Sequence, residues 1–491
     1  MRRLFRRDEG FTLAWLAMIL FLLLAMAGFG TDLGWMYLNT VRTQNAVDAA
    51  ALAGVVNLPG FDPAPDAEAA AQANGYDPGG ADTLTLTQTE DNELYAELTT
   101  SIEPFFMRVL GFTHFDITRE STARYIKPVP LGSPSNCFGG GGSAPPCTGA
   151  EDFWAAASGR NTRLEDGDPY STLCDLNSGS GCTSSNGAYA RGGLYPGYYY
   201  GVEVPTGSSG LQVEIFNGGF NTSGIPGDSN FPGPAGSIDT TFTLYEPDTT
   251  PLIPQDHLDG TAGGVCSESP GSGATGWDQL CSTVANPQPG IWLVHVETTS
   301  NTAGSNNFAI RATASPTAPR VYGINDMSIW SDELVGASEL YIAEVTEEHA
   351  GKKLELSFYD AGDAFGESWY RVINPHGGSA QCSWKVYTAQ YPDPSASEVP
   401  SLSSSGVELC QWQTQVTSPS SPAGIYNKLW IVATIDLPDD PVDMCADDGS
   451  PDDCFWKMEL DIADPTERTT WRARVIGNPV QLVPTPTTTL P

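Results

Sequence analysis

The hydrophobic pattern divides the chain into a helical start and a long strand-rich remainder. An uncharged apolar run from Gly10 to Gly30 follows the basic residues Arg2, Arg3, Arg6 and Arg7. About 20 helical residues cross the ~30 Å hydrocarbon layer of a bilayer, so the run predicts a transmembrane helix at 10–30 after a basic segment at 1–9. Because basic residues stay on the cytoplasmic side, the bulk of the chain is expected to lie outside the membrane.

The residues expected to face lipid share large apolar side chains. They are Leu13, Leu16, Ile19, Leu20, Phe21, Leu22, Leu23 and Leu24. The alternative is a cleaved secretory signal, whose apolar core is about 7–15 residues long and ends at a small-residue cleavage site. The run here is longer and continues into a helical pattern, which favours a retained signal anchor in a single-pass cell-membrane protein.

Beyond the apolar run, small residues recur at helical spacing at Ala46, Ala49, Ala50 and Ala53. Small side chains allow another helix to approach closely, so this face predicts packing on a head domain or on a neighbouring helix. Asp32, Gly34 and Tyr37, earlier on the same helix, are expected to belong to the same helix-packing face. Pro59 is expected to end the helix.

The same stretch carries an ordered set of residues that resembles a known family. These are Asp32, Gly34 and Tyr37, followed after six residues by the run from Gln44 to Gly54. Their order and spacing resemble the N-terminal module of the bacterial Tad/Flp pilus-assembly proteins of the TadE/TadG-like group, over about residues 8–125. The resemblance implies a single-pass envelope protein associated with the Flp pilus or related machinery, and it implies no reaction.

One difference from pilins concerns processing. The segment Arg7–Leu13 is similar to a prepilin cleavage site after glycine, but the fifth position of the mature chain is Trp15 rather than glutamate. The sequence therefore argues against cleavage, and a mature chain that begins at Phe11 would contradict this expectation.

The rest of the 31–126 segment predicts a small α/β head. An alanine-rich helix at Ala67–Ala73 ends at Asn74 and Gly75, and alternating strands surround Leu84–Leu86 and Leu94–Leu98. A helical turn is expected over Phe105–Gly111, with a further strand from Phe115.

The remaining chain predicts two tandem antiparallel β-sandwich domains. Residues 127–150 form a Gly/Pro-rich linker, residues 151–318 and 319–480 the sandwiches, and residues 481–491 a flexible Thr/Pro tail. The expected fold class is thus a multidomain chain, in which a transmembrane helix with a small α/β head precedes two sandwiches of about seven to nine strands each.

The two sandwich segments resemble each other, which indicates an internal repeat. The matching pairs are Tyr200–Val204 with Tyr341–Val345, Leu211–Gly219 with Leu354–Gly362, Phe242–Pro247 with Tyr370–Pro375, and Ile291–Val294 with Leu429–Val432. Trp292 and Trp430 then occupy equivalent strands, where they are interpreted as core aromatic residues, with sugar stacking as the alternative.

The charge of the chain limits which partners it can bind, and its cysteine content indicates the cellular compartment in which it lies. Asp and Glu number 59 against 23 Lys and Arg, a balance that argues against nucleic acid as a partner. The ten cysteines fall in neighbouring couples that lack zinc-site spacing, and they indicate disulfides formed outside the cytoplasm. The couples are Cys137/Cys147, Cys174/Cys182, Cys266/Cys281, Cys382/Cys410 and Cys445/Cys454.

The sequence offers no catalytic motif, so the chain is not expected to be an enzyme. His295 lies in an apolar strand and is interpreted as a strand residue and not a catalyst. Glu203 and Glu344 occupy matching positions of the repeat, where a pair of carboxylates could serve acid–base chemistry, but they alternate with apolar neighbours as on a solvated strand face. No cofactor is expected. Acidic loops around Asp436–Asp453 and Asp360–Asp363 leave weak calcium binding open beside simple solvated charge.

Three functions remain. The first is a membrane-anchored envelope protein that displays its sandwiches for pilus assembly, adhesion or partner binding, with the lipid bilayer and other envelope proteins as partners. The second is a surface carbohydrate- or matrix-binding module on a membrane tether. The third is an anchored hydrolase, which no constellation of residues supports.

Overall fold

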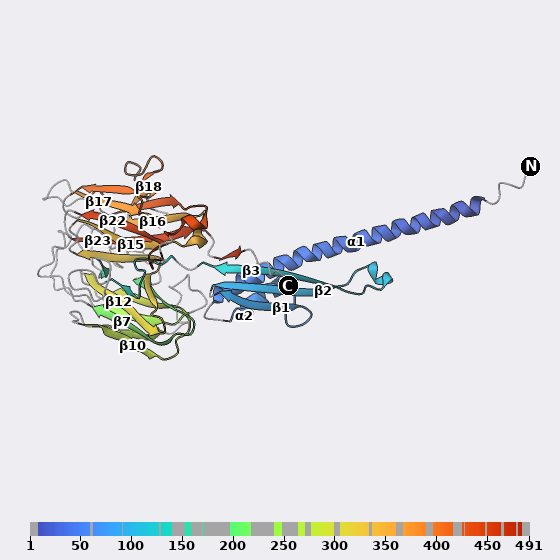
Figure 1. Cartoon of the computed structure of the whole chain (residues 1–491), viewed down its shortest axis with the longest axis horizontal. Coiled ribbons are helices and arrows are strands. Elements are labelled where there is room, and N and C mark those ends of the chain that lie inside the picture. The colour runs from blue at the N-terminus through green and yellow to red at the C-terminus, as the bar shows by residue number, and fades with distance from the viewer. Residues whose placement is uncertain are drawn as a thin grey trace, which may run out of the picture. The chain divides into compact units, whose positions relative to one another are not determined.

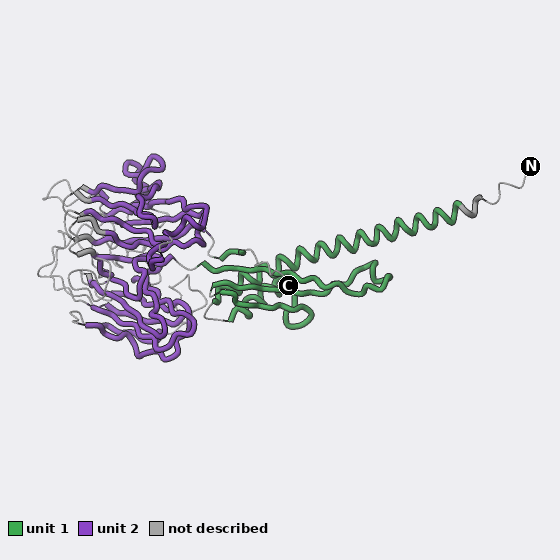
Figure 2. The backbone as a smooth tube through the Cα atoms, in the orientation of Figure 1, with its two compact units in different colours: residues 1–126, 479–491 green, residues 127–478 purple. Residues whose placement is uncertain are grey.

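The structure is a computed structural model of the whole chain, and it forms two compact units (Figure 2). The first contains residues 1–126 and 479–491, and the second contains residues 127–478. The structure describes residues 8–58, 62–90, 92–126, 129–139, 153–158, 169, 197–217, 240–247, 264–270, 276–298, 305–332, 336–359, 367–388, 396–415, 425–426, 428–446, 449–462, 466–477 and 480–483.

The first unit begins with one long helix, α1 (Asp8–Gly54), seen at the blue end of the chain in Figure 1. The expected transmembrane helix and its expected extension therefore form a single helix without a break. The alanine-rich part from Ala46 to Ala53 favours helix strongly, so the helix continues until the 3₁₀ turn η1 (Val55–Asn57).

A second helix and a sheet complete this unit. Helix α2 (Ala64–Ala73) ends at Asn74, whose side chain and backbone both bond back to the last turn, and Gly75 follows with a φ of +92°. The sheet has the order β1–β2–β3–β24 and is antiparallel throughout. Its strands are β1 (Thr83–Glu90), β2 (Glu93–Ile102), β3 (Phe115–Tyr125) and β24 (Val480–Val483), and the turn η2 (Met107–Leu110) lies between β2 and β3.

Strand β24 comes from the segment that was expected to be the end of the second sandwich and a flexible tail. Val480 pairs with Tyr125 and Val483 with Thr122, so β24 covers the outer edge of β3. An uncovered edge strand offers a row of unpaired backbone groups, and this short apolar segment satisfies them. The second unit is therefore inserted between β3 and β24 of the first.

The second unit contains two halves, each with eight main strands. The first half has β5 (Phe153–Ser158), β6 (Tyr198–Val204), β7 (Ser209–Asn217), β8 (Thr240–Tyr245), β9 (Gly264–Glu268), β10 (Asp278–Val284), β11 (Gly290–Thr298) and β12 (Ser305–Ser315). The second half has β14 (Asp326–Asp332), β15 (Gly336–Glu344), β16 (Lys353–Tyr359), β17 (Glu367–Ile373), β20 (Gln411–Gln415), β21 (Leu429–Asp436), β22 (Phe455–Ile462) and β23 (Thr466–Ile476). The further elements of this unit are β4 (Cys137–Phe138), β13 (Arg320–Gly323), β18 (Gln381–Thr388), β19 (Glu408–Leu409), η6 (Glu347–His349) and η7 (Pro441–Asp443).

The two halves have the same strand order. In the first half, β5, β12, β7 and β10 are neighbours in one sheet and β6, β11, β8 and β9 in the other. In the second half, β14, β23, β16 and β21 match the first set, and β15, β22, β17 and β20 match the second. Numbered within each half, the orders are 1-8-3-6 and 2-7-4-5, which is the arrangement of an eight-stranded jelly roll.

The pairing registers of the halves also agree. Trp292 lies opposite Val202 in the first half, as Trp456 lies opposite Ala343 in the second. On the other side of the same strands, Phe242 pairs with Val296, as Tyr370 pairs with Leu460. Equivalent residues therefore meet across equivalent strands.

One of the four matched segment pairs is wrong. Ile291–Val294 belongs to β11, but Leu429–Val432 belongs to β21, whose counterpart in the first half is β10. The structural counterpart of Trp292 is Trp456 on β22, and not Trp430. The two segments look alike because both strands are buried along most of their length, so each reads as a tryptophan among aliphatic residues.

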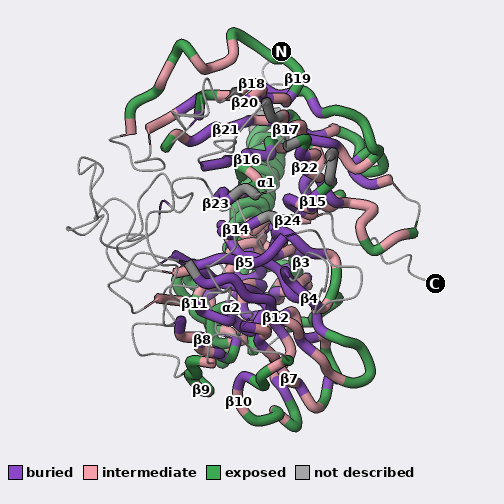
Figure 3. Tube along the Cα trace, turned by 90° about the vertical axis from the view of Figure 1, so that its left-hand side faces the viewer, coloured by how far each residue is buried: buried purple, intermediate pink, exposed green. Residues whose placement is uncertain are grey.

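The boundary expected between two separate sandwiches is crossed by a shared sheet. Strand β5 of the first half pairs with β14 of the second, with Ala155 opposite Ile329 and Trp154 opposite Trp330. The result is one eleven-stranded sheet that runs through both halves, with buried residues along its central strands (Figure 3). The opposing layer contains a five-stranded sheet in the first half and a four-stranded sheet in the second.

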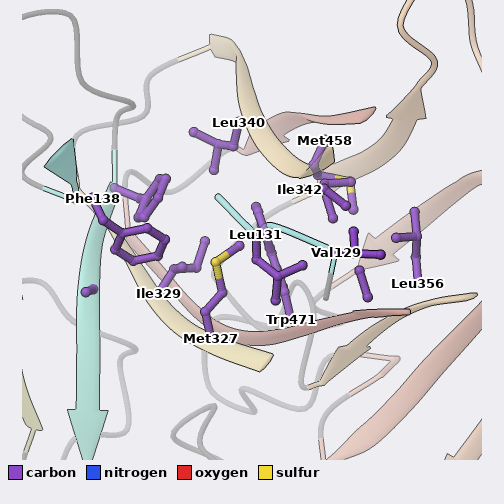
Figure 4. Packing of buried hydrophobic residues seen from close by; sticks show 14 of the residues in the cluster. Val129, Leu131, Phe138, Met327, Ile329, Leu340, Ile342, Leu356, Met458 and Trp471 are labelled. Carbon is purple, nitrogen blue, oxygen red and sulfur yellow. The ribbon is translucent and has the colours of Figure 1, made fainter. Parts of the chain in front are cut away.

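Part of the segment expected to be a linker joins the opposing layer as well. Leu131 exchanges backbone hydrogen bonds with Gly323 of β13, and Gly132 donates one to Ile342 of β15. Leu131 is fully buried beside Met327, Ile342 and Trp471 (Figure 4), in a core cluster that contains residues from both halves. The apolar residues within this Gly/Pro-rich stretch place residues 129–139 in the body of the unit, while residues 140–150 lie outside the described part of the chain.

Candidate functional site

The apolar part of α1 presents large side chains that nothing in the described chain covers. Thr12–Asn57 is long and apolar enough to cross a membrane, and its most apolar window has a mean hydropathy of 2.3. The eight predicted lipid-facing residues are between 48% and 72% exposed: Leu13, Leu16, Ile19, Leu20, Phe21, Leu22, Leu23 and Leu24. Such a surface is unstable in water and stable in hydrocarbon, because apolar groups are driven out of water.

Just beyond this apolar stretch, Asp32 binds the loop between β2 and β3. We call residues 103–114 the hairpin tip. The Asp32 carboxylate accepts hydrogen bonds from the backbone N–H groups of Phe105 (2.8 Å), Phe106 (2.9 Å) and Met107 (2.6 Å). These N–H groups begin the turn η2, so the carboxylate satisfies donors that the turn itself leaves unpaired. The Asp32 side chain is fully buried as a result.

Two ring contacts add to this attachment. The rings of Trp35 and Phe105 lie 5.4 Å apart, and Phe106 packs against Gly28. A Cβ atom at Gly28 would come within 2.9 Å of the Phe106 ring, so any larger residue would displace the ring. The hairpin tip is therefore fixed to α1 at the level of residues 28–35.

The residues predicted as a packing face divide into two groups. Ala46 and Ala50 are buried, and Ala49 and Ala53 are half-buried. The alanines pack on the head of the same chain, where Ala50 joins Ala67 and Ala71 of α2 in an apolar cluster. This is the first of the two packing partners that the sequence left open.

Of the other three members of that predicted face, Asp32, Gly34 and Tyr37, the last two are exposed on α1. Tyr37 is 73% exposed, and a Cβ atom at Gly34 would meet open space. Asp32 is buried through its bonds to the hairpin tip, and not through contact with another helix. The sequence predicted the helical turn over Phe105–Gly111, but it gave no sign that Asp32 binds this turn.

Replacing Asp32 by alanine is expected to release the hairpin tip from α1. The three backbone N–H groups lose their acceptor, so hydrogen exchange at residues 105–107 should accelerate to the rate of an exposed loop. Mass-spectrometric hydrogen exchange on the full chain in detergent micelles measures this directly. Asp48→Ala is the matched control, because Asp48 lies on the same helix and bonds only the nearby Gln44 in the described contacts. Equal exchange in the two variants contradicts the assignment.

In the second unit, the two glutamates considered for acid–base chemistry lie on either side of one arginine. Arg320 of β13 pairs in register with Glu203 of β6, and its Nη1 atom lies 2.9 Å from a carboxylate oxygen of Glu344. Burial alone would lower the pKa of Arg320, but the charges of Glu344 and Glu203 raise it above its ordinary value. This is the arrangement of an ion pair that joins the two halves.

The histidine and tryptophan candidates are packed inside the sandwiches. The His295 ring stacks on Tyr199 at 4.8 Å and is 3% exposed. Trp292 and Trp430 are fully buried, and the Trp292 indole N–H donates to the carbonyl of Gln288 at 2.8 Å. Neither tryptophan presents a face on which a sugar ring could stack.

Burial of another histidine makes the stability of the second unit depend on pH. Burial, with the charge of Lys352, lowers the pKa of His349 to about 4. The folded unit thus requires the neutral ring: its stability is complete above the ordinary histidine pKa of about 6.5 and should fall by up to about 3 kcal/mol as the pH drops toward 4. In urea titrations over this range, His349→Gln should remove the loss, whereas the exposed His376→Gln should retain it. A His349→Gln variant with the unchanged pH profile would refute this.

The acidic loops have structural partners where they are described. Asp436 pairs with Lys353, and Asp440 accepts a hydrogen bond from the backbone of Val442. Among the described residues, no group of three or more His, Cys, Asp or Glu side chains could hold a metal ion. Asp360, Asp363, Asp447 and Asp448 lie outside those residues.

Three of the expected cysteine couples are joined as disulfides: Cys266–Cys281, Cys382–Cys410 and Cys445–Cys454. Cys137 is also disulfide-bonded, while Cys147, Cys174 and Cys182 lie outside the described part of the chain. Cys266 and Cys410 occupy equivalent places, because Cys266 lies opposite Leu244 of β8 and the Cys410 carbonyl accepts a hydrogen bond from Val372, the equivalent residue of β17.

Comparisons with known proteins agree with the resemblance read from the sequence. Residues 10–72 match the family model described as "Tad: Putative Flp pilus-assembly TadE/G-like", a range that includes most of α1 and α2. No curated protein matches the chain.

Among solved structures, one similar chain is the N-terminal CBM22-1-CBM22-2 tandem domain of Xyn10C from Paenibacillus barcinonensis. It is 9% identical, and the alignment covers 80% of this chain and 92% of that one, with a TM-score of 0.11. A score at this level supports no argument about this chain.

Proposed function

We propose that this chain, which carries a TadE/G-like module at residues 10–72, is a single-pass envelope protein that displays its second unit outside the cell membrane for pilus assembly or attachment. The observation that carries the proposal is the uncovered apolar surface of α1 within the very segment that matches the family. The family supports a pilus-assembly setting, and we propose a mechanical role for the chain in that setting.

Two features support an orientation with the second unit outside. Four arginines, Arg2, Arg3, Arg6 and Arg7, precede the apolar run, and basic flanks remain in the cytoplasm. Disulfides follow the run, and disulfides persist in oxidising compartments. The net charge of −36 favours partners that are cationic or polar over anionic surfaces.

We also propose that the two halves of the second unit arose by duplication. The support is the common strand order together with registers that agree across two strand pairs in each half. A duplicated, rigid body suits a spacer or a surface for partners more than a single small-molecule site. The carbohydrate- or matrix-binding alternative is not argued further, since the two tryptophans considered for sugar stacking are buried.

The test is deletion of the gene in its own bacterium, followed by scoring of surface pili and attachment. Complementation with the full chain should restore both, whereas the chain lacking residues 127–478 should remain in the membrane without restoring attachment. Protease added to intact spheroplasts should remove the second unit and leave the N-terminal segment protected. Unchanged pili and attachment in the deletion strain would exclude the pilus-assembly role.

A further inference from the structure

The hairpin tip carries an apolar surface that a soluble loop would not be expected to keep. Exposed fractions are 58% for Phe105, 53% for Phe106, 87% for Val109, 74% for Leu110 and 51% for Phe112. Five large apolar side chains within eight residues form a patch of the kind that marks an interaction surface. The long β2–β3 hairpin carries this patch away from the rest of its sheet, as Figure 1 shows.

The patch is held in a fixed place on the same chain. Asp32 binds three consecutive backbone N–H groups of the hairpin tip, Trp35 packs on Phe105, and Gly28 allows Phe106 to lie against α1. Hydrogen bonds to Asp32 and ring contacts at Trp35 and Gly28 together set the position of the tip relative to α1. The exposed apolar side chains of the tip are therefore held at a fixed position on α1 and do not belong to a freely moving loop.

The level at which the tip is held coincides with the end of the apolar stretch of α1. Gly10–Gly30 spans about 31 Å as a helix, which matches the hydrocarbon thickness of a bilayer. Residues 28–35, which hold the tip, then lie at the outer boundary of the hydrocarbon. Met26 and Phe29, on either side of the Gly28 position against which Phe106 packs, are exposed on α1.

The charges of the tip favour a lipid over a charged protein partner. Arg108 pairs with Glu103 at 2.9 Å, and His114 lies 3.9 Å from the same glutamate. The charged groups of the tip thus compensate one another, and the remaining surface is aromatic and aliphatic. Phenylalanine and leucine are among the residues that interfacial segments insert at the boundary between headgroups and acyl chains, and Trp35, which packs on Phe105, is of a type enriched at that boundary.

From this geometry we propose that the hairpin tip is a second membrane contact, which dips into the outer boundary of the bilayer that α1 spans. The inference rests on the proposed insertion of α1. Two contacts on separate elements fix the tilt and the rotation of the head on the membrane, which a single helix leaves free. Burial of apolar surface drives the contact, so it should be insensitive to salt.

The experiment measures the depth of single positions in vesicles of phosphatidylcholine and phosphatidylglycerol. A spin label is attached through a genetically encoded azido residue, because the native cysteines are needed for disulfides. The full chain is labelled at one of three positions, 22 in the anchor, 110 in the tip or 88 on β1. Gln88 pairs with Leu94, eight residues along β2 from Ile102, and so lies about 27 Å from the base of the tip.

Collision of the label with oxygen or with a water-soluble nickel chelate reports whether the position lies in lipid or in water. Position 110 should resemble position 22, with access to oxygen and protection from nickel, in low and high salt alike, and position 88 should show the opposite. Val109→Asp should make position 110 accessible to nickel, while the matched Val407→Asp, which replaces an exposed valine of the second unit, should not.

The outcomes separate the two proposals. If position 22 lies in lipid and position 110 in water, the tip proposal is wrong and the anchor stands. If both positions are in water, the proposed insertion of α1 itself fails. A label at position 110 that is protected from both reagents indicates cover by protein, such as a second copy of the chain, and also overturns the proposal.

Discussion

A chain in which Leu20 and Leu22 are both replaced by arginine is expected to leave the membrane fraction. Both side chains lie near the middle of the apolar stretch and are more than half exposed on α1. Each arginine near the centre of a membrane helix costs about 2.5–3.5 kcal/mol, so the pair costs about 5–7 kcal/mol. Because about 1.4 kcal/mol is a tenfold change in an equilibrium, partition into the membrane should fall by several orders of magnitude.

Extraction of bacterial membranes with alkaline carbonate, followed by immunoblotting, measures the result. The control is Val41→Arg, which adds a charge to the exposed side of the same helix beyond the apolar stretch. It should leave the chain membrane-bound. Intact mass of the unaltered protein belongs to the same experiment, since a chain that begins after the apolar run would show a cleaved signal. Retention of the double variant in the membrane would contradict the anchor.

The second large effect is expected from Trp292→Ala, which removes a fully buried indole from β11. Truncating a buried tryptophan to alanine costs about 3–5 kcal/mol, because the cavity is only partly filled by relaxation. The shared eleven-stranded sheet and the common core should transmit this loss to the second half. Hydrogen exchange at β11 and at β16 should therefore accelerate together.

The matched control is Leu409→Ala, at an exposed position on β19, where a change of less than about 0.5 kcal/mol is expected. If only the first half exchanges faster in Trp292→Ala, the halves unfold independently and the shared sheet does not couple them. Equal acceleration in both halves would establish one cooperative unit across residues 127–478.

Features that depend on neighbouring residues could be predicted from the sequence. The apolar run, the alanine-rich continuation of α1, the stop at Asn74 and Gly75, and the alternating strands of the head all follow from local periodicity and turn residues. The cysteine couples belong here as well, because the described disulfides join residues separated by 9 to 28 positions.

Features that depend on distant pairing could not be predicted. The β5–β14 contact and the β3–β24 contact join segments whose sequences carry no mark of their partners. The assignment of Trp430 failed for a related reason. A strand buried on both faces loses the alternation that would place it in one sheet or the other, and only the register distinguishes β21 from β22.

The hairpin tip stands between these cases. Asp32 belongs to the residues that carry the family resemblance, but its partners lie 73 to 75 positions later. A carboxylate at the end of a membrane helix is a marker of function in general. Its actual role, as the acceptor for a turn, needs the fold.

The place where the large body joins the head has a consequence for engineering and for evolution. Tyr125, where the chain leaves the head, and Val480, where it returns, are direct cross-strand partners. Tyr125 and Val480 are thus as close as the two residues that flank the turn of a tight β-hairpin. A two-residue turn could replace all residues between them without disturbing the pairing of β3 with β24. Domains of different size could therefore be inserted between these two adjacent strand ends, while the head and its membrane helix stay the same.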